Sequence, residues 1–470
     1  MRTRRFRTYC EFLELSALSL SGAIALAISS EAQAAPKPNI VFFLVDDFGK
    51  GALASMGSDL HETPHIDALA ESGIRFSDGY AACTVCSPSR AAILTGRYPG
   101  RTNLTDWIAG HTKKNAKLKI PDWQMYMDHE LTILPEALKE HGYATAFVGK
   151  WHLMPTREPE RMKKHFPTDH GFDINIGGRE WGQPKGPGKY FHPFGMPNVT
   201  SKEGDFLTDR LTDYAVDFIA ENKSNPFLLY MSYYTVHGPI MGKPELVEKY
   251  KKKLAAGEYK QTNPKYAAMV ESLDDSVGRI LNRLKELQLD KNTIVVFTGD
   301  NGADYNPYTG GLKNRKAFAH EGGVREPVIV SWPGTIKPGG VSEVPMTGTD
   351  FYPTLLDLAG LPAKEDQHLD GVSLKPILLQ EGDIAERSLF WHYPHYHRTK
   401  PYGAIRKGDW KLIEFFEDGS LELYNLKDDL AETTNLADQN PSKAKALLTE
   451  LKEWRVSVEA QMPTLKTPSK

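Results

Sequence analysis

Four short apolar runs of this 470-residue sequence are each followed by side chains that can take part in chemistry. The runs and the residues that follow them are 40–45 with Asp46 and Asp47, 293–297 with Asp300 and Asn301, 143–148 with Lys150 and His152, and 227–231 with His237. Each run is rich in β-branched or aromatic residues and too short for a helix, which is typical of buried strands. Ligands of open α/β sheets bind beyond the carboxyl ends of the strands, so we expect these groups to meet at one sheet edge.

Three carboxylates and one amide of this set can form an oxygen cage for a metal ion. The four residues are Asp46, Asp47, Asp300 and Asn301, and their hard oxygen atoms favour Ca²⁺ or Mg²⁺ over Zn²⁺. Nearby Lys and Arg side chains would balance the remaining negative charge and attract an anionic substrate. Taken singly, an Asp-Asp pair or an Asp-Asn-Gly segment is also a common turn, and a lone His237 is also an ordinary surface or core residue. Their common position at strand ends favours a site.

Two cysteines lie beside the expected start of a helix. Ser87 can cap that helix, Pro88 suits its first turn and Gly96 suits its end. Cys86 is therefore expected just before a helix N-terminus, where free N–H groups and the helix dipole favour anions. The alternative is that Cys83 and Cys86 form a disulfide or redox pair.

The sequence around Cys86 favours a different chemistry. Cys86-Ser-Pro-Ser-Arg90, followed after a short spacer by Leu94-Thr-Gly-Arg97, resembles the signature of type I sulfatases. The chain is similar to arylsulfatase A-like members of the alkaline phosphatase superfamily over roughly residues 37–440. Further matching segments are 39–47, 63–67, 149–152, 299–302, 316–323 and 350–354.

This resemblance implies a modified nucleophile and a bound metal ion. Cys86 would be oxidised to formylglycine (3-oxoalanine) by a dedicated maturation enzyme that acts on the unfolded chain. The implied metal ligands are Asp46, Asp47, Cys86, Asp300 and Asn301, with one Ca²⁺ per chain. The implied catalytic residues are Cys86, Arg90, Lys150, His152, His237 and Lys316.

The resemblance also implies a role for each of these groups. A hydroxyl of the hydrated aldehyde would attack sulfur in line, while the metal, Lys316 and Arg90 stabilise charge on the sulfuryl oxygens. Lys150 would join Arg90 in holding the aldehyde hydrate and the sulfate. His237 would protonate the departing alcohol, or Lys316 would help to do so, and His152 would take the proton of the other hydroxyl as sulfate leaves.

The expected substrate is a sulfated carbohydrate or an aryl sulfate, with an exo-acting glycan sulfatase as the preferred hypothesis. Arg and His can bond to sugar hydroxyls and sulfates, and Trp can stack on a sugar face. The substrate-binding candidates are Arg179, Trp181, His392 and His395, the last two within a cluster that extends to His397 and Arg398. The alternative for this cluster is that it packs a domain interface.

Two other functions are alternatives. One is a phosphoester or phosphonate-ester hydrolase of the same superfamily. The maturation motif argues against a zinc phosphatase, which uses a Ser or Thr nucleophile, although phosphonate-ester hydrolases can also carry formylglycine. The other is a non-catalytic binder of sulfated glycans in which residue 86 is never matured.

The order of strand-like and helical patterns predicts the fold. Helical patterns near 64–72, 133–141 and 266–287 alternate with the strands, which predicts an α/β domain over 35–385. Its sheet is expected to be large, mixed and mostly parallel, flanked by helices and alkaline phosphatase-like. Turn signals separate strand-like runs at 402–406, 410–416 and 421–424, and a helical pattern covers 442–458. These predict a small C-terminal antiparallel sheet with a helix over 386–470.

Composition and the N-terminal segment indicate an exported globular protein. The chain has 57 Lys and Arg against 60 Asp and Glu, a net charge of −3, which offers no bulk field for nucleic acid. Residues 1–34 combine four arginines, an apolar stretch and a small-x-small pattern near Ala34, as in a secretory signal peptide. We expect a periplasmic or secreted protein, with an uncleaved anchor as the alternative. No later stretch is apolar enough for stable membrane insertion.

Overall fold

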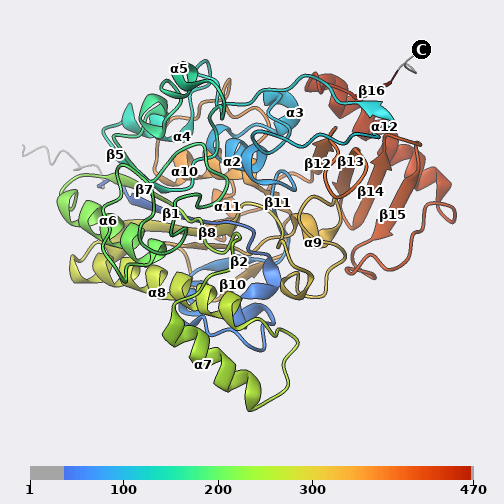
Figure 1. Cartoon of the computed structure of the whole chain (residues 1–470). Coiled ribbons are helices and arrows are strands. Elements are labelled where there is room, and N and C mark those ends of the chain that lie inside the picture. The colour runs from blue at the N-terminus through green and yellow to red at the C-terminus, as the bar shows by residue number, and fades with distance from the viewer. Residues whose placement is uncertain (1–35, 467–470) are drawn as a thin grey trace, which may run out of the picture. The chain divides into compact units, whose positions relative to one another are not determined.

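An eight-stranded sheet lies at the centre of the computed structural model, which describes residues 36–466 (Figure 1). In spatial order its strands are β10 (Gly340–Ser342), β2 (Ile74–Phe76), β9 (Val328–Ser331), β8 (Thr293–Gly299), β1 (Asn39–Val45), β7 (Phe227–Ser232), β5 (Ala144–Gly149) and β6 (Ile174–Ile176). Of these eight, β9 alone is antiparallel to its neighbours. The predicted large, mixed and mostly parallel sheet is confirmed.

The position of strand β1 in the middle of the sheet explains why its sequence is apolar throughout. It pairs in parallel with β7 on one side and β8 on the other, so that Val41 lies opposite Leu229 and Val295. Alternate side chains of β1 point to opposite faces of the sheet, and both faces are covered, so every residue of the strand is buried.

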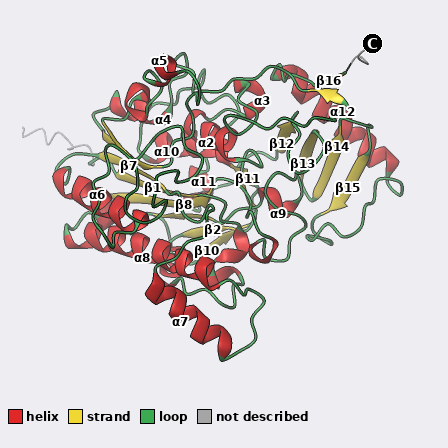
Figure 2. Cartoon of the chain, viewed as in Figure 1, coloured by secondary structure: helices red, strands yellow, loops and turns green. Residues whose placement is uncertain are grey.

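Helices cover both faces of this sheet (Figure 2). Helices α1 (Pro64–Glu71), α6 (Leu207–Glu221) and α8 (Pro264–Glu286) pack on the face that carries Val41 and Phe43. Helices α2 (Cys86–Thr95), α4 (Leu134–Lys139) and α10 (Phe351–Leu358) pack on the face that carries Ile40 and Phe42. The result is a three-layer α/β/α arrangement.

A second, antiparallel sheet follows in the C-terminal part of the chain. Its strands are β12 (Ser388–Tyr393), β13 (Tyr402–Lys407), β14 (Trp410–Phe415) and β15 (Leu421–Asn425). Helix α12 (Pro441–Ser457) packs one face, where Leu447 and Leu451 meet Ile405 and Leu412. Three of these strands and the helix were predicted, whereas β12 was not.

A buried ion-pair cluster fastens this sheet to the rest of the fold. Lys411 of β14 is fully buried, and its Nζ lies 2.8 Å from a carboxylate oxygen of Glu321 and 3.1 Å from one of Glu432. Glu321 begins the short helix α9 (Glu321–Val324), so Lys411 joins the second sheet to the loops beside the main sheet.

The remaining elements are short, apart from α7. They are α3 (Pro99–Thr102), α5 (Pro159–Met162), α7 (Pro244–Ala255), α11 (Lys375–Leu378), the parallel pair β3 (Gly79–Tyr80) with β11 (Met346–Thr347), and the antiparallel pair β4 (Leu118–Lys119) with β16 (Thr464–Leu465). The described residues from Lys37 onward form one compact unit, so a domain boundary at 385 stays a prediction. The predicted signal peptide, 1–34, lies outside the described residues.

Candidate active site

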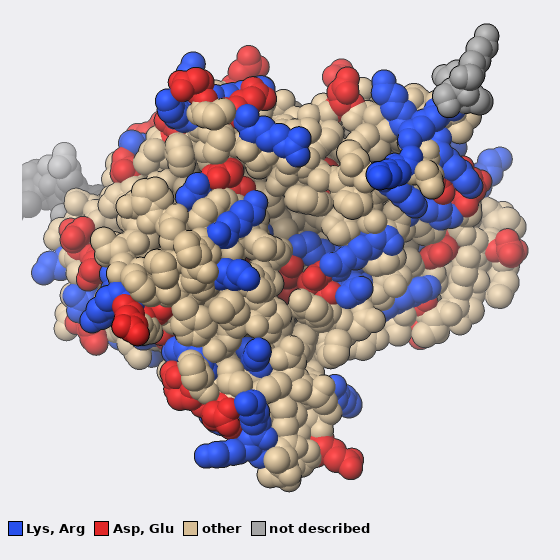
Figure 3. Space-filling view, viewed as in Figure 1, with Lys and Arg blue, Asp and Glu red and all other residues tan. Residues whose placement is uncertain are grey.

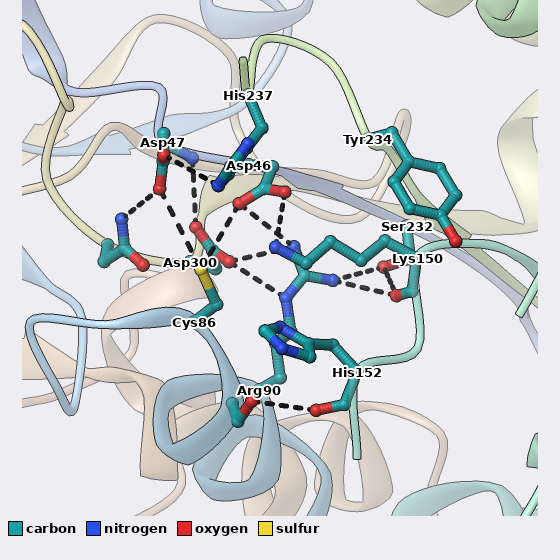
Figure 4. Close-up of polar contacts among 12 residues, drawn as sticks. Asp46, Asp47, Cys86, Arg90, Lys150, His152, Ser232, Tyr234, His237 and Asp300 are labelled. Carbon is teal, nitrogen blue, oxygen red and sulfur yellow. Dashed lines mark hydrogen bonds and ion pairs between the residues drawn. The ribbon is translucent and has the colours of Figure 1, made fainter. Parts of the chain in front are cut away.

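The carboxyl ends of four neighbouring strands bring the chemically active residues together. Strands β8, β1, β7 and β5 are adjacent and parallel, so their C-terminal ends lie at the same edge of the sheet. The residues that follow them are Asp300 and Asn301 after β8, Asp46 and Asp47 after β1, His237 beyond β7, and Lys150 and His152 after β5 (Figure 4). The sheet edge thus assembles the groups that the sequence places at separate strand ends.

Helix α2 brings Cys86 to the same edge. Cys86 is the first residue of the helix and is 2% exposed, and Gly96 ends the helix with a φ of 67°. The prediction that Ser87 caps this helix is wrong. The Ser87 hydroxyl instead donates to the carbonyl oxygen of His152 (2.8 Å) and accepts a hydrogen bond from the backbone N–H of Ile108 (3.1 Å). It therefore fastens the helix to the loop after β5.

Cys83 and Cys86 are both free thiols in the described structure, so they do not form the alternative disulfide. The Sγ atom of Cys86 lies 3.6 Å from Oδ1 of Asp46 and 3.2 Å from Nζ of Lys316. Burial raises the pKa of the Cys86 thiol to about 12, against the lowering effect of Lys150 and Lys316. The unmodified side chain is therefore a neutral thiol and a weak nucleophile.

Each of the three aspartates is paired with one cation. Lys150 Nζ lies 2.6 Å from Oδ2 of Asp46, and Lys316 Nζ lies 2.6 Å from Oδ1 of Asp47. The guanidinium of Arg90 donates to Oδ2 of Asp300 from Nε (2.9 Å). All six side chains are at most 8% exposed, so three carboxyl groups and three basic side chains lie together in a site that is nearly shielded from solvent.

The neighbouring buried carboxyl groups of Asp46 and Asp47 have pKa values that are shifted in opposite directions. Burial raises the pKa of Asp46 to about 8, and the carboxylates of Asp300 and Asp47 add to this rise against the lowering effect of Lys150. Burial also acts on Asp47, but Lys316 and His237 hold the pKa of that carboxyl well below its usual range. Without a further cation, the acid beside Cys86 thus favours a protonated state.

The residues around Cys86 fit a hard divalent cation. The side-chain oxygen Oδ1 of Asn301 is buried without a hydrogen-bond partner among the described residues, while its Nδ2 donates to Oδ1 of Asp47 (2.7 Å). Single ligand atoms of Asp46, Asp47, Cys86 and His237 lie within 4.8 Å of one another. A bound cation would be coordinated by the free Oδ1 atom of Asn301 and would take the place of the proton on Asp46. Carboxylate and amide oxygens suit Ca²⁺ or Mg²⁺.

Two histidines of the site are held in defined tautomers by backbone carbonyls. His152 donates from Nε2 to the carbonyl oxygen of Ile108 (2.5 Å), which leaves a buried Nδ1 lone pair with no partner among residues 36–466. His237 donates from Nδ1 to the carbonyl oxygen of Gly238 (2.9 Å), and its Nε2 lies 3.5 Å from Oδ2 of Asp47. Burial lowers the pKa of His237 to about 4 and holds the pKa of His152 well below its usual value. Both rings are neutral at pH 7, and His152 presents a proton acceptor.

A cavity of about 240 Å³ opens at Cys86. It is lined by Cys86, Trp107, Ile108, His152, Gly182, Gln183, Lys185, His237, Asp304, Lys316, His397 and Arg398. On the molecular surface, Lys and Arg side chains gather around a hollow near α9, with acidic side chains inside it (Figure 3). The cavity combines an aromatic wall with groups that can bond to hydroxyls and anions.

The four substrate-binding candidates from the sequence are not among the lining residues. Arg179 stacks on Trp181, with its guanidinium carbon 3.9 Å from the ring centroid, and it pairs with Glu180. His392 donates from Nε2 to the carbonyl oxygen of Gln461 (3.0 Å), and His395 is fully buried, with its Nε2 2.8 Å from the Thr105 hydroxyl oxygen. Both histidines are therefore buried in the protein interior.

Other lining residues were missed by the sequence analysis or named there only as part of a cluster. His397 and Arg398 directly follow the buried histidines, and Arg398 forms an ion pair with Asp304. The signal for Asp304 was its place three residues beyond Asn301. Gln183 and Lys185 lie in a Gly- and Pro-rich loop, and Trp107 carried no local signal at all.

The fold and the site define a class of enzyme, the hydrolases of the alkaline phosphatase superfamily, which have a three-layer α/β/α fold. A family model described as Sulfatase matches residues 38–361, and one described as N-sulphoglucosamine sulphohydrolase, C-terminal, matches residues 313–461. The chain belongs to the sulfatase family and is a sulfuric ester hydrolase.

Similar proteins cover most of the chain. A sulfatase of Formosa agariphila is 31% identical over 96% of this chain and 95% of its own length. The N-acetylgalactosamine-6-sulfatase of Sus scrofa is 35% identical over 81% of this chain and 73% of its own length. The crystal structure of Ps i-CgsB in complex with k-i-k-neocarrahexaose matches with a TM-score of 0.73 and 28% identity, over 89% of this chain and 93% of that one.

None of the helices within residues 36–466 has the length and apolar character needed to cross a lipid bilayer.

Proposed function

We propose that this sulfatase is exported and removes sulfate from the terminal unit of a sulfated carbohydrate, with formylglycine made from Cys86 as its nucleophile and one Ca²⁺ as its cofactor. The observation that carries the proposal is the position of Cys86. Its Sγ lies at a cavity that also presents Lys316, His152 and His237, and it lies 3.6 Å from Asp46. The sulfatase motif that begins at Cys86 supports its conversion to the aldehyde.

Formylglycine at position 86 would supply, once hydrated, a hydroxyl nucleophile, and Ca²⁺ would supply a Lewis acid held by Asp46, Asp47, Asp300 and Asn301. Lys316 adds a fixed positive charge beside residue 86, because its Nζ lies 3.2 Å from Sγ. Burial lowers the pKa of Lys316, but Asp47 and the other acids raise it well above its usual value, so the ammonium keeps its charge. It can stabilise negative charge on a sulfuryl oxygen.

Arg90 and Lys150 act by holding other groups in place. Nη1 of Arg90 donates to the carbonyl oxygen of Lys150 (2.9 Å) and to the hydroxyl oxygen of Ser232 (2.7 Å), while its Nε donates to Oδ2 of Asp300. Lys150 is fully buried against Asp46. The two cations thus orient Asp46 and Asp300, two of the acids that would bind the metal. For Arg90 or Lys150 to contact a bound sulfate, these hydrogen bonds would have to rearrange.

The two histidines take opposite roles in proton transfer. His152 has its Nε2 proton fixed on the Ile108 carbonyl, so its free Nδ1 is the atom that can accept a proton at the cavity wall. His237 has its Nδ1 proton fixed on the Gly238 carbonyl, so Nε2 is the atom that can deliver a proton to the departing alcohol. Because burial lowers the pKa of His237 to about 4, Nε2 would carry this proton only once a bound sulfate anion favours the protonated ring, which could then pass the proton to the departing alcohol.

The cavity supports a carbohydrate substrate and exo action. At about 240 Å³ it lies below the range of roughly 300–1,000 Å³ that is typical of sites for drug-sized ligands, which fits one sulfated sugar unit. Trp107 offers a stacking surface, and Asp304 and Arg398 offer partners for ring hydroxyls. The similarity to an N-acetylgalactosamine-6-sulfatase and to a structure with bound neocarrahexaose supports a glycan.

The decisive assay is sulfate release by protein coexpressed with a formylglycine-generating enzyme. A panel of defined sulfated mono- and disaccharides, with 4-methylumbelliferyl sulfate and its phosphate analogue, covers the alternatives. We expect sulfate from terminal sulfated sugars and little phosphate from the analogue. Faster phosphate release than sulfate release, or no sulfate from any sugar by fully matured protein, would contradict the proposal.

A further inference from the structure

Three histidines lie together away from the residues that line the active-site cavity. His129 precedes α4, His165 follows α5, and His170 ends the 3₁₀ turn η3 (Pro167–His170). The ring centroids of His129 and His170 are 4.2 Å apart, those of His129 and His165 are 4.7 Å apart, and those of His165 and His170 are 5.6 Å apart. One ring nitrogen from each lies within 4.8 Å of the other two.

The buried members of this histidine cluster lack hydrogen-bond partners. His170 is fully buried, and neither of its ring nitrogens has a partner among the described residues. Nδ1 of His165, which is 5% exposed, is also unpartnered there. A buried polar group left without a partner costs about 1–3 kcal/mol, and native proteins pair almost all such groups. These nitrogens therefore point to a missing ligand.

The ring of His129 is oriented by a backbone hydrogen bond, as is common in metal-binding histidines. His129 donates from Nε2 to the carbonyl oxygen of Lys164 (2.7 Å), which leaves Nδ1 as a lone pair. Histidine ligands commonly donate the second ring N–H to a backbone carbonyl, which fixes the tautomer and turns the other nitrogen to the metal.

We propose that His129, His165 and His170 bind a Zn²⁺ ion, with water as the fourth ligand on the exposed side of His129. Three imidazoles without a carboxylate suit Zn²⁺ better than Ca²⁺, so this ion is distinct from the one beside Cys86. A shallow depression lined by His129 and Glu136 gives access from solvent.

Zinc binding requires the histidine rings to turn. At Zn–N distances of about 2.0–2.1 Å, tetrahedral coordination places ligand nitrogens about 3.4 Å apart. The rings of His129 and His170 are stacked, with 8° between their planes, so they must turn about their Cβ–Cγ bonds to converge.

The position of this site gives it a structural role. Trp151 donates from Nε1 to the carbonyl oxygen of His165 (2.8 Å), and its ring lies 5.8 Å from that of His170. Trp151 stands between Lys150 and His152 in the chain. A zinc ion here would therefore brace the loop that carries both active-site residues.

The test is zinc binding by calorimetry to chelator-stripped protein in saturating Ca²⁺. A Cys86→Ser background removes the thiol as a competing zinc ligand. We expect one Zn²⁺ per chain in this background and in a His141→Ala control, and at least about ten-fold weaker binding after His129→Ala. His129 is exposed, so its removal should leave the fold intact by circular dichroism. No zinc bound in the background, or equal binding with and without His129, would overturn the proposal.

Co²⁺ gives a second readout that does not depend on stability. The protein with intact His129 should develop the intense visible absorption of tetrahedral cobalt, and the His129→Ala protein should not. The same spectrum in both proteins would contradict coordination by His129. Neither readout uses sulfate release, so a failure of the proposed glycan sulfatase function would leave this result unchanged.

Discussion

The Nζ atom of Lys316 lies 3.2 Å from the Sγ atom of Cys86, and the same atom lies 2.6 Å from Oδ1 of Asp47. One buried cation thus contacts both the residue that we assign as nucleophile and an acid that we assign to the metal site. This arrangement makes metal binding and the chemistry at residue 86 interdependent.

Removal of the metal should inactivate the enzyme reversibly. We expect EGTA to abolish sulfate release and Ca²⁺ to restore it, because the acids beside residue 86 need a counter-cation. Asn301→Ala removes the free amide oxygen and should weaken Ca²⁺ binding by at least about ten-fold. Calcium titration of the melting temperature measures this, with Asn282→Ala as the control. Equal calcium dependence of the two variants would exclude Asn301 as a ligand.

His237 should matter most when the leaving group is poor. His237→Ala is expected to lower kcat/KM for a sugar sulfate by about 10²–10³-fold and for 4-methylumbelliferyl sulfate by less than about ten-fold. The reason is that an activated phenol leaves without a proton, whereas a sugar alcohol does not. Parallel steady-state kinetics check this, and equal losses on both substrates would count against a proton donor.

Arg398 should select the sugar rather than the sulfate. It lines the cavity and pairs with Asp304, so Arg398→Ala should raise KM for a sulfated sugar by about 10–100-fold, in line with one charge-assisted hydrogen bond. The small aryl sulfate should be little affected. Arg179→Ala is the matched control, because Arg179 stacks on Trp181 and does not line the cavity. Identical effects of the two changes would argue against a sugar contact.

Lys411 should contribute strongly to stability. Lys411→Ala leaves Glu321 and Glu432 buried without this counter-ion and should lower the free energy of unfolding by about 3–5 kcal/mol. Lys407→Ala in the neighbouring strand breaks an exposed, solvent-screened pair with Glu450 and should leave the free energy of unfolding nearly unchanged. Urea unfolding compares the two, and a small effect at Lys411 would mean that the cluster does not hold the second sheet.

The main sheet and the group of residues at its edge could be predicted because local patterns specify them. A buried parallel strand must be apolar throughout, so the polar residue that follows marks its end, as Asp46 follows β1. Parallel neighbours then place these ends at one edge without further information.

Features that depend on tertiary packing could not be predicted. Ser87 has the residue type of a helix cap, but its hydroxyl bonds to a loop 65 residues away. Strand β12 contains His392, whose side chain turns to the interior, and residue type alone does not separate a buried histidine from a ligand-binding one. Arg398 and Asp304 are 94 residues apart, so only the folded chain brings them together.

The measurement that tests the central claim most directly is the chemical state of residue 86 in active protein. An aminooxy probe forms an oxime with an aldehyde but not with a thiol, and the tryptic peptide 76–90 contains residue 86. Labelling of this peptide should rise in proportion to sulfate release across preparations with different degrees of maturation. Cys86→Ser, in a host that converts only cysteine, should show neither labelling nor turnover, with activity reduced by more than about 10³-fold and an unchanged fold. Full turnover by protein whose residue 86 is an unmodified thiol would contradict the account.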